Sequence, residues 1–216
     1  MPLPFLRRKR DSAAPTGSAV QPGAARRPRG VAFDGLTEEW RLIGTMSVER
    51  RLSDVLNKRE AIPIADVRWA PIDGSADFTA VPGLKSIDPY DLIVVLAGEG
   101  TLPPLTEAEH EAHKVHKIAY DVLLEVPPFR VIGTVHLCPG SEPDRLLDRA
   151  TEMFVPVTGA VALLGDRQVS DPEVDILLVN RFYLRGVEQI DKRTRERHLP
   201  LPGAPLGGIS WQDRSR

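Results

Sequence analysis

The feature that most constrains the fold of this chain is the repetition of its central part. Five short segments of the first half resemble five segments of the second half, in the same order. The matched pairs are residues 31–34 with 118–121, 40–46 with 129–135, 51–54 with 145–148, 62–64 with 155–157, and 88–95 with 171–179. Because matches in a fixed order at similar spacing are typical of tandem units, the sequence predicts an internal duplication.

Each unit is predicted to run in the order strand, short helix, strand, loop, strand. Residues 40–48 and 129–137 alternate apolar and polar side chains, which is typical of strands with one buried face. Apolar residues at helical spacing predict short helices over 50–58 and from about 141 to 153. The remaining strands are predicted at 61–69, 92–96, 154–164, 176–179 and 182–190.

The predicted fold class is therefore α+β, mainly β, built from two tandem units. One unit of about 70 residues is marginal alone, so two units should pack together as two small barrels or one pseudo-twofold body. The domain boundaries follow from composition. They are a basic tail at 1–30, unit one at 31–100, a linker with helical character at 101–117, unit two at 118–190, and a basic tail at 191–216. Both tails are expected to be disordered.

The two ends and the middle of the chain carry opposite charge. Residues 1–30 hold seven basic residues and one acidic residue, a net charge of +6, and residues 191–216 hold six and three, a net +3. Since the whole chain has 28 basic and 30 acidic residues, residues 31–190 carry −11. An acidic body argues against nucleic-acid binding by the core, whereas the tails could bind anionic surfaces.

Several common activities lack their sequence signatures here. The chain has no glycine-rich dinucleotide or phosphate loop, no nucleophile elbow and no paired cysteines. It has one cysteine, Cys138, so no intramolecular disulfide can form, and no apolar run long enough to cross a membrane. The N-terminus lacks the order of a signal peptide. These observations argue against an enzyme, imply no cofactor, and predict a cytoplasmic protein.

One short motif lies on the first predicted helix. Residues 51–57 read Arg-Leu-Ser-Asp-Val-Leu-Asn, and the motif of interest comprises Arg51, Ser53, Asp54 and Asn57. It resembles the signature of an uncharacterised bacterial domain family, and this resemblance implies no activity. The second unit replaces Ser53 and Asn57. We favour a structural interpretation, in which the apolar residues fill the core, Asp54 pairs with an arginine and Asn57 ends the helix.

The linker contains three histidines at helical spacing. His110, His113 and His116 would lie on one side of a helix, with carboxylates nearby. Imidazole and carboxylate groups bind zinc and similar divalent ions, so this tract is a candidate metal site. The alternative is a solvated helix of mixed charge that joins the two units.

Three functions follow from these patterns. The first is a non-catalytic interaction or scaffold protein, whose duplicated units present a surface to a protein partner. The second is binding of nucleic acid or another anionic surface through the basic tails. The third is a divalent-metal-binding enzyme or sensor centred on the three histidines.

Overall fold

Antiparallel strands make up about half of the residues that the computed structural model describes. These residues are 29–49, 51–98, 101, 116–148, 152–191 and 194. The first half contains β1 (Arg29–Leu36), β2 (Trp40–Val48), α1 (Leu52–Leu56), β3 (Ile62–Pro71), β4 (Thr79–Ala80), β5 (Ser86–Ile87), η1 (Pro89–Asp91) and β6 (Val94–Ala97). The second half contains β7 (Ile118–Val126), β8 (Phe129–Leu137), η3 (Pro143–Leu147), β9 (Phe154–Leu164), β10 (Arg167–Gln168), β11 (Ile176–Asn180) and β12 (Gly186–Gln189).

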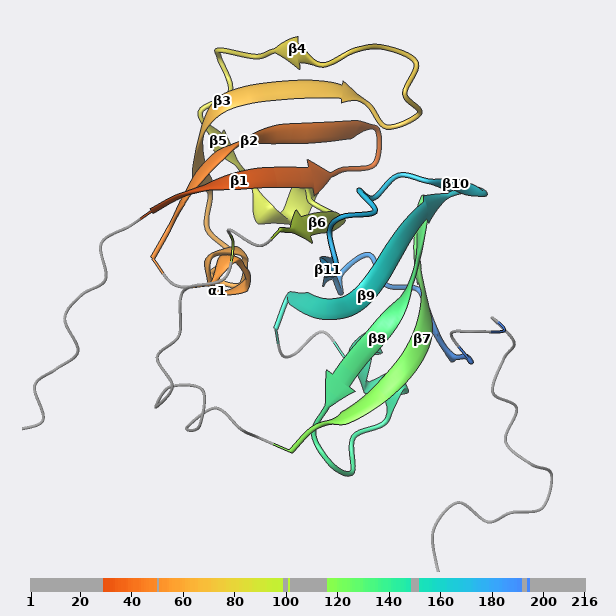
Figure 1. The fold of residues 1–216 in the computed structure, drawn as a ribbon. Coiled ribbons are helices and arrows are strands. Elements are labelled where there is room, and N and C mark those ends of the chain that lie inside the picture. The colour runs from red at the N-terminus through yellow and green to blue at the C-terminus, as the bar shows by residue number, and fades with distance from the viewer. Residues whose placement is uncertain are drawn as a thin grey trace, which may run out of the picture.

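The described strands form one sheet that runs through both halves. Its order is β12-β7-β8-β9-β11-β6-β1-β2-β3-β4, with β10 on β9 and β5 on β3. Figure 1 shows β1, β2 and β3 on one side, β7, β8 and β9 on the other, and β6 and β11 between them. Over the described residues this path does not close, so the prediction of two separate barrels is not confirmed, whereas the mainly β class is.

The central strands β6 and β11 separate two hydrophobic cores. Val95 and Leu178 point into the core of the first half, whereas Val94 and Leu177 point into the core of the second half. Successive side chains of a strand point to opposite faces, so a strand between two cores must be apolar at every position. This requirement explains the unbroken apolar run of residues 92–97, all of which are buried.

The two outer meanders contain the same irregularity. The pairing of β2 with β3 shifts between Ile43 and Thr45, and the pairing of β8 with β9 shifts between Ile132 and Thr134. The residues that begin the bulge on the opposite strand, Asp66 and Gly159, both have positive φ, 54° and 50°. A glycine inside a strand often marks a bulge or close packing, and Gly44 and Gly133 each lie at such a bulge.

The two hairpins before these bulges have the same length, since Gly44 and Gly133 each lie opposite the residue eleven positions earlier. The sequence match between 31–34 and 118–121 is out of register by two residues in the structure, because Asp34 lies opposite Ile43 whereas Asp121 lies opposite Thr134. As a result, Asp121 accepts a hydrogen bond from the Thr134 hydroxyl, 2.6 Å away, instead of pairing with an arginine.

Several predicted element boundaries were wrong. The first helix spans only Leu52–Leu56, and the second is a 3₁₀ helix that ends at Leu147, because Asp148 already has extended backbone dihedrals. The strand predicted at 182–190 is shorter, since residues 182–184 turn before β12 begins at Gly186. Strands β1 and β7 were recognised as repeats but not as strands. Most of the linker and both predicted tails lie outside the described residues.

Gly133 should tolerate no side chain, because a Cβ atom there would lie 2.6 Å from Val157 Cγ1 and 2.9 Å from Ala160 Cβ. We expect Gly133→Ala to lower the free energy of unfolding by about 1–3 kcal/mol, measured by urea denaturation. Gly44→Ala should behave alike, since its Cβ would lie 2.8 Å from the Ala65 carbonyl oxygen. Gly83→Ala is the control, because no atom lies within 4 Å of its added Cβ. Equal stability of all three variants would contradict this account.

Candidate interaction surface

The motif predicted on the first helix packs into the first core and contacts the second half through one residue, Asn57. Leu52 and Leu56 are buried in the first core and Val55 packs against it, as the structural interpretation requires. The Asp54 carboxylate accepts a hydrogen bond from the backbone N–H of Arg51, at 3.3 Å, and so caps the helix start. Ser53 is partly buried, and its carbonyl accepts the Asn57 N–H at 2.9 Å.

Asn57 is the member of this motif that reaches the second half. Its side-chain oxygen accepts the backbone N–H of Phe154 at 2.7 Å, and its amide donates to the Phe154 carbonyl at 3.4 Å. Phe154 is the first residue of β9 and is fully buried. The asparagine therefore ends α1 and also provides the partner that this backbone N–H needs in a dry environment. No reactive group converges on these four residues in the described structure.

Replacing Asn57 should lower the free energy of unfolding, because the role of this residue is structural. Asn57→Ala leaves the Phe154 N–H without its acceptor, so we expect a loss of about 1–3 kcal/mol in thermal or urea unfolding. Asn57→Asp keeps an acceptor oxygen in the same position and should lose clearly less. The interpretation would be wrong if the alanine variant were as stable as the parent chain.

The predicted metal site lies mostly outside the described residues. His110 and His113 are not described, and His116 is exposed at the start of the second half. Within the described ranges, no three His, Cys, Asp or Glu side chains are grouped so as to hold a metal ion. Metal binding by the histidine tract therefore stays a prediction.

Two pairs of packed aromatic rings and one further tyrosine lie near the junction of the two halves. The first pair is Trp69 and Trp40, whose rings stack with their centroids 5.0 Å apart. Trp40 lines a hollow of about 210 Å³ together with Tyr183 from the second half. Tyr183 donates a hydrogen bond to the carbonyl oxygen of Tyr90, at 3.0 Å, and the Tyr90 ring packs against Phe182 at 5.5 Å. We call these five residues the aromatic strip.

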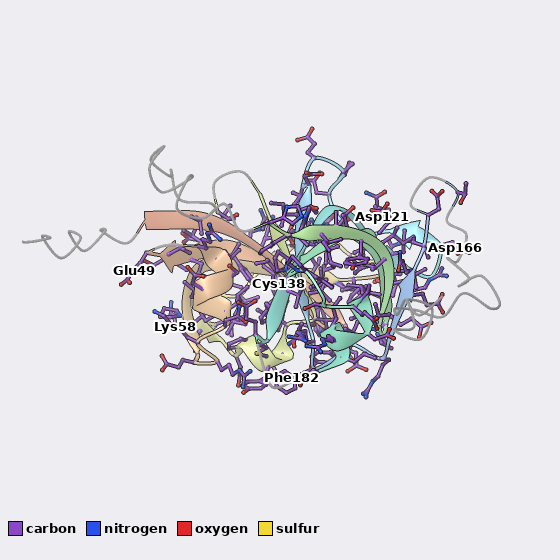
Figure 2. The ribbon with its side chains drawn as sticks, turned by 90° about the horizontal axis from the view of Figure 1, so that it is seen from below. Glu49, Lys58, Asp121, Cys138, Asp166 and Phe182 are labelled. Carbon is purple, nitrogen blue, oxygen red and sulfur yellow. The ribbon has the colours of Figure 1, made fainter. Side chains whose placement is uncertain are left out.

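Two of the five residues of the aromatic strip are exposed to solvent, and the other three are partly buried. Tyr90 is 43% exposed and Trp69 is 36% exposed, two of the four large hydrophobic side chains that are exposed in the described structure. Figure 2 shows Phe182 at the periphery of the molecule, beside the segment that contains η1. Exposed rings that lie beside further partly buried rings form a grouped apolar surface, and such a surface is able to bind another molecule.

Acidic side chains surround the hollow in the aromatic strip. Glu38, Glu39 and Asp91 line it beside Trp40 and Tyr183, and we call these three carboxylates the acidic rim. The pKa of Tyr183 is raised, mainly because burial disfavours its phenolate and further because Asp91 and Glu38 are negatively charged. The three carboxylates of the acidic rim carry negative charge, so this part of the surface favours cations.

A second hollow, of about 320 Å³, lies between the β3–β4 loop and β10. Its two arginines are occupied by contacts within the protein. Arg41 pairs with Asp34, which raises the pKa of its guanidinium, and also donates to the carbonyl oxygen of Val169 at 3.3 Å. Arg167 donates to the carbonyl oxygen of Ile72 at 2.5 Å. These bonds join the two halves, so this hollow is a structural junction.

The sequence did not reveal the aromatic strip. Its members are scattered over residues 40, 69, 90, 182 and 183, and no local pattern connects them. The available signal was the dipeptide Phe182–Tyr183 directly after a buried strand, which we had assigned to a further strand. Pairing of β6 with β11 places that dipeptide beside η1.

No family model, no curated protein and no solved structure matches this chain. The resemblance of residues 51–57 to a bacterial domain family therefore stays a prediction. In the part of the chain that is described, no helix has the length and apolar character needed to cross a membrane.

Proposed function

We propose that this protein is a non-catalytic interaction or scaffold protein that binds a protein partner through the aromatic strip. The observation that carries this proposal is the exposure of Tyr90 and Trp69, each packed against a second aromatic ring, on either side of the hollow that Trp40 and Tyr183 line together. Aromatic side chains dominate the binding energy of protein interfaces, because they bury large areas and lose few rotamers on binding.

The surroundings of the aromatic strip suit a binding surface. Tyr90 lies in the short helix η1, whose start is fixed by the Asp88 carboxylate accepting the Tyr90 N–H at 2.9 Å. Behind it, the buried Asn180 amide donates to the carbonyl of Leu92 at 2.7 Å, and its oxygen accepts the Phe182 N–H at 3.0 Å. These bonds hold the rings on a rigid base, so that little conformational entropy is lost when a partner binds.

We further propose that the protein acts in the cytoplasm. We also propose that its two halves are diverged copies of one unit. The shared bulges at Gly44 and Gly133 support the duplication. So do two identical turns, in which Asp88 and Asp171 each accept the N–H of the residue two positions on, at 2.9 Å. At the position of Tyr90, however, the second turn has Glu173. The aromatic strip therefore occurs once, and we expect one partner molecule per chain.

Truncating Tyr90 should weaken partner binding. Its contacts with Tyr183 and Asp88 use backbone atoms, so Tyr90→Ala removes the exposed ring and leaves those hydrogen bonds in place. If Tyr90 is a hot spot, its loss weakens binding about tenfold or more. The measurement is quantitative capture of partners from an extract of the native cells, with the intact chain and the variant side by side.

Ile118→Ala is the matched control for this experiment, because Ile118 is also an exposed large apolar residue, at 36% against 43% for Tyr90, but lies in β7. A partner that is lost with Tyr90→Ala and retained with Ile118→Ala supports the proposal. A partner captured equally by all three chains would assign binding to another surface.

A further inference from the structure

The chemistry of the aromatic strip specifies the kind of ligand that it can hold. Three carboxylates face the same hollow as Trp40 and Tyr183, and within this lining no basic side chain balances them. Exposed aromatic rings beside negative charge attract guanidinium and ammonium groups, through cation–π contacts and Coulomb attraction. The same negative charge repels phosphate groups, which makes nucleic acids and anionic lipids poor ligands for this surface.

The strip already contains one interaction of this type. The guanidinium carbon of Arg59 lies 5.6 Å from the centroid of the Phe182 ring. A cationic side chain that stacks on an aromatic residue of the strip is therefore compatible with its geometry. A ligand with several consecutive basic residues and an apolar neighbour would contact both the rings and the acidic rim.

We propose that the aromatic strip and its acidic rim bind a basic segment, residues 5–10 of this same chain. The segment reads Phe-Leu-Arg-Arg-Lys-Arg, with four consecutive basic residues directly after two apolar ones. The inference rests on the aromatic strip being the binding surface of the proposed function. It adds that the chain's own N-terminus competes with the partner for that surface.

The length of the intervening chain suits this contact. The described structure begins at Arg29, at one end of the eight-residue strand β1, and the turn that carries Glu38 and Trp40 follows the other end. Eight strand residues span about 26 Å. Residues 11–28 connect the segment to Arg29, and a stretch of eighteen residues can span at most about 60 Å. Residues 5–10 can therefore reach the strip at a high effective concentration.

The C-terminal segment is a weaker candidate for the same surface. Its net charge is +3 over residues 191–216, and its basic residues are mostly scattered or paired with acidic ones. It begins eight residues after Tyr183, so chain length does not separate the two segments. Residues 1–30 carry +6, with four basic residues in one run. Charge therefore favours the N-terminal segment.

The test places a nitroxide spin label beside the segment in the full-length chain. Ser12→Cys with Cys138→Ser provides one labelling position, two residues after Arg10. We expect the label to broaden the amide resonances of residues 37–40 and 90–91 and the indole resonance of Trp40. Replacing the four basic residues at 7–10 by serine should remove this broadening. So should Glu38→Gln combined with Asp91→Asn, and so should 1 M salt, where the Debye length is about 3 Å.

Matched controls identify the occupant. Glu142→Gln with Asp144→Asn removes two exposed carboxylates next to and within η3, away from the strip, and should leave the broadening unchanged. Broadening at other residues, or broadening that persists without the four basic residues, would overturn the proposal.

A mixture of spin-labelled chains and unlabelled ¹⁵N chains tests whether the segment of a second copy occupies the strip. If the resonances broaden as strongly in that mixture, the occupant comes from another molecule and the intramolecular contact is refuted.

Partner capture separates this inference from the proposed function. If both hold, the chain with serine at 7–10 captures more partner than the intact chain, because the strip is no longer occupied. If Tyr90→Ala abolishes capture but no specific broadening is seen, the proposed function stands and the inference fails. If the broadening is specific but the Tyr90→Ala variant captures as much partner as the intact chain, the segment binds the strip and the partner binds elsewhere.

Discussion

The pairing of β6 with β11 is the constraint on which the rest of the structure depends. These two strands are buried on both faces and form the wall between two hydrophobic cores. Each fully buried Val or Leu contributes about 1.5–3 kcal/mol, and Leu177, Val94 and Val95 are all inaccessible to solvent. Because each half supplies one strand of the wall, neither core is complete without the other half. The two meanders are therefore held in one orientation.

Hydrogen bonds from polar side chains fix the positions of the short helices and of one turn, which the apolar wall alone does not determine. Apolar burial has no direction, whereas a hydrogen bond to a buried backbone group requires a defined geometry. Asn57 fixes α1 against the first residue of β9. Arg181 is buried, with the pKa of its guanidinium lowered by desolvation, and donates to the carbonyl oxygens of Leu146 and Arg145 at 2.7 and 2.6 Å, which fixes η3. Asn180 fixes the turn that carries Phe182, and so positions the aromatic strip.

Local patterns predicted the strands well and the helices less well. The apolar runs at 92–96 and 154–164 identified β6 and β9, because burial of a strand determines its residue types directly. The apolar residues from 141 to 153 predicted a helix that is longer than η3. Leu146 reaches the core from the short 3₁₀ helix, and Met153 reaches it from the chain that follows. Neither β1 nor β7 was recognised as a strand, although both lie within segments that repeat.

The sequence by itself determined the mainly β composition, the two glycine positions that bend the meanders, and the opposite charges of the body and the ends. These properties depend on residue type and on neighbours along the chain. Only the tertiary structure decided that the halves share one sheet, that Asn57 reaches Phe154, and that rings from residues 40, 69, 90, 182 and 183 form one surface. The reason is physical, since these contacts join residues that are far apart in the sequence, and which of them meet depends on strand order and register.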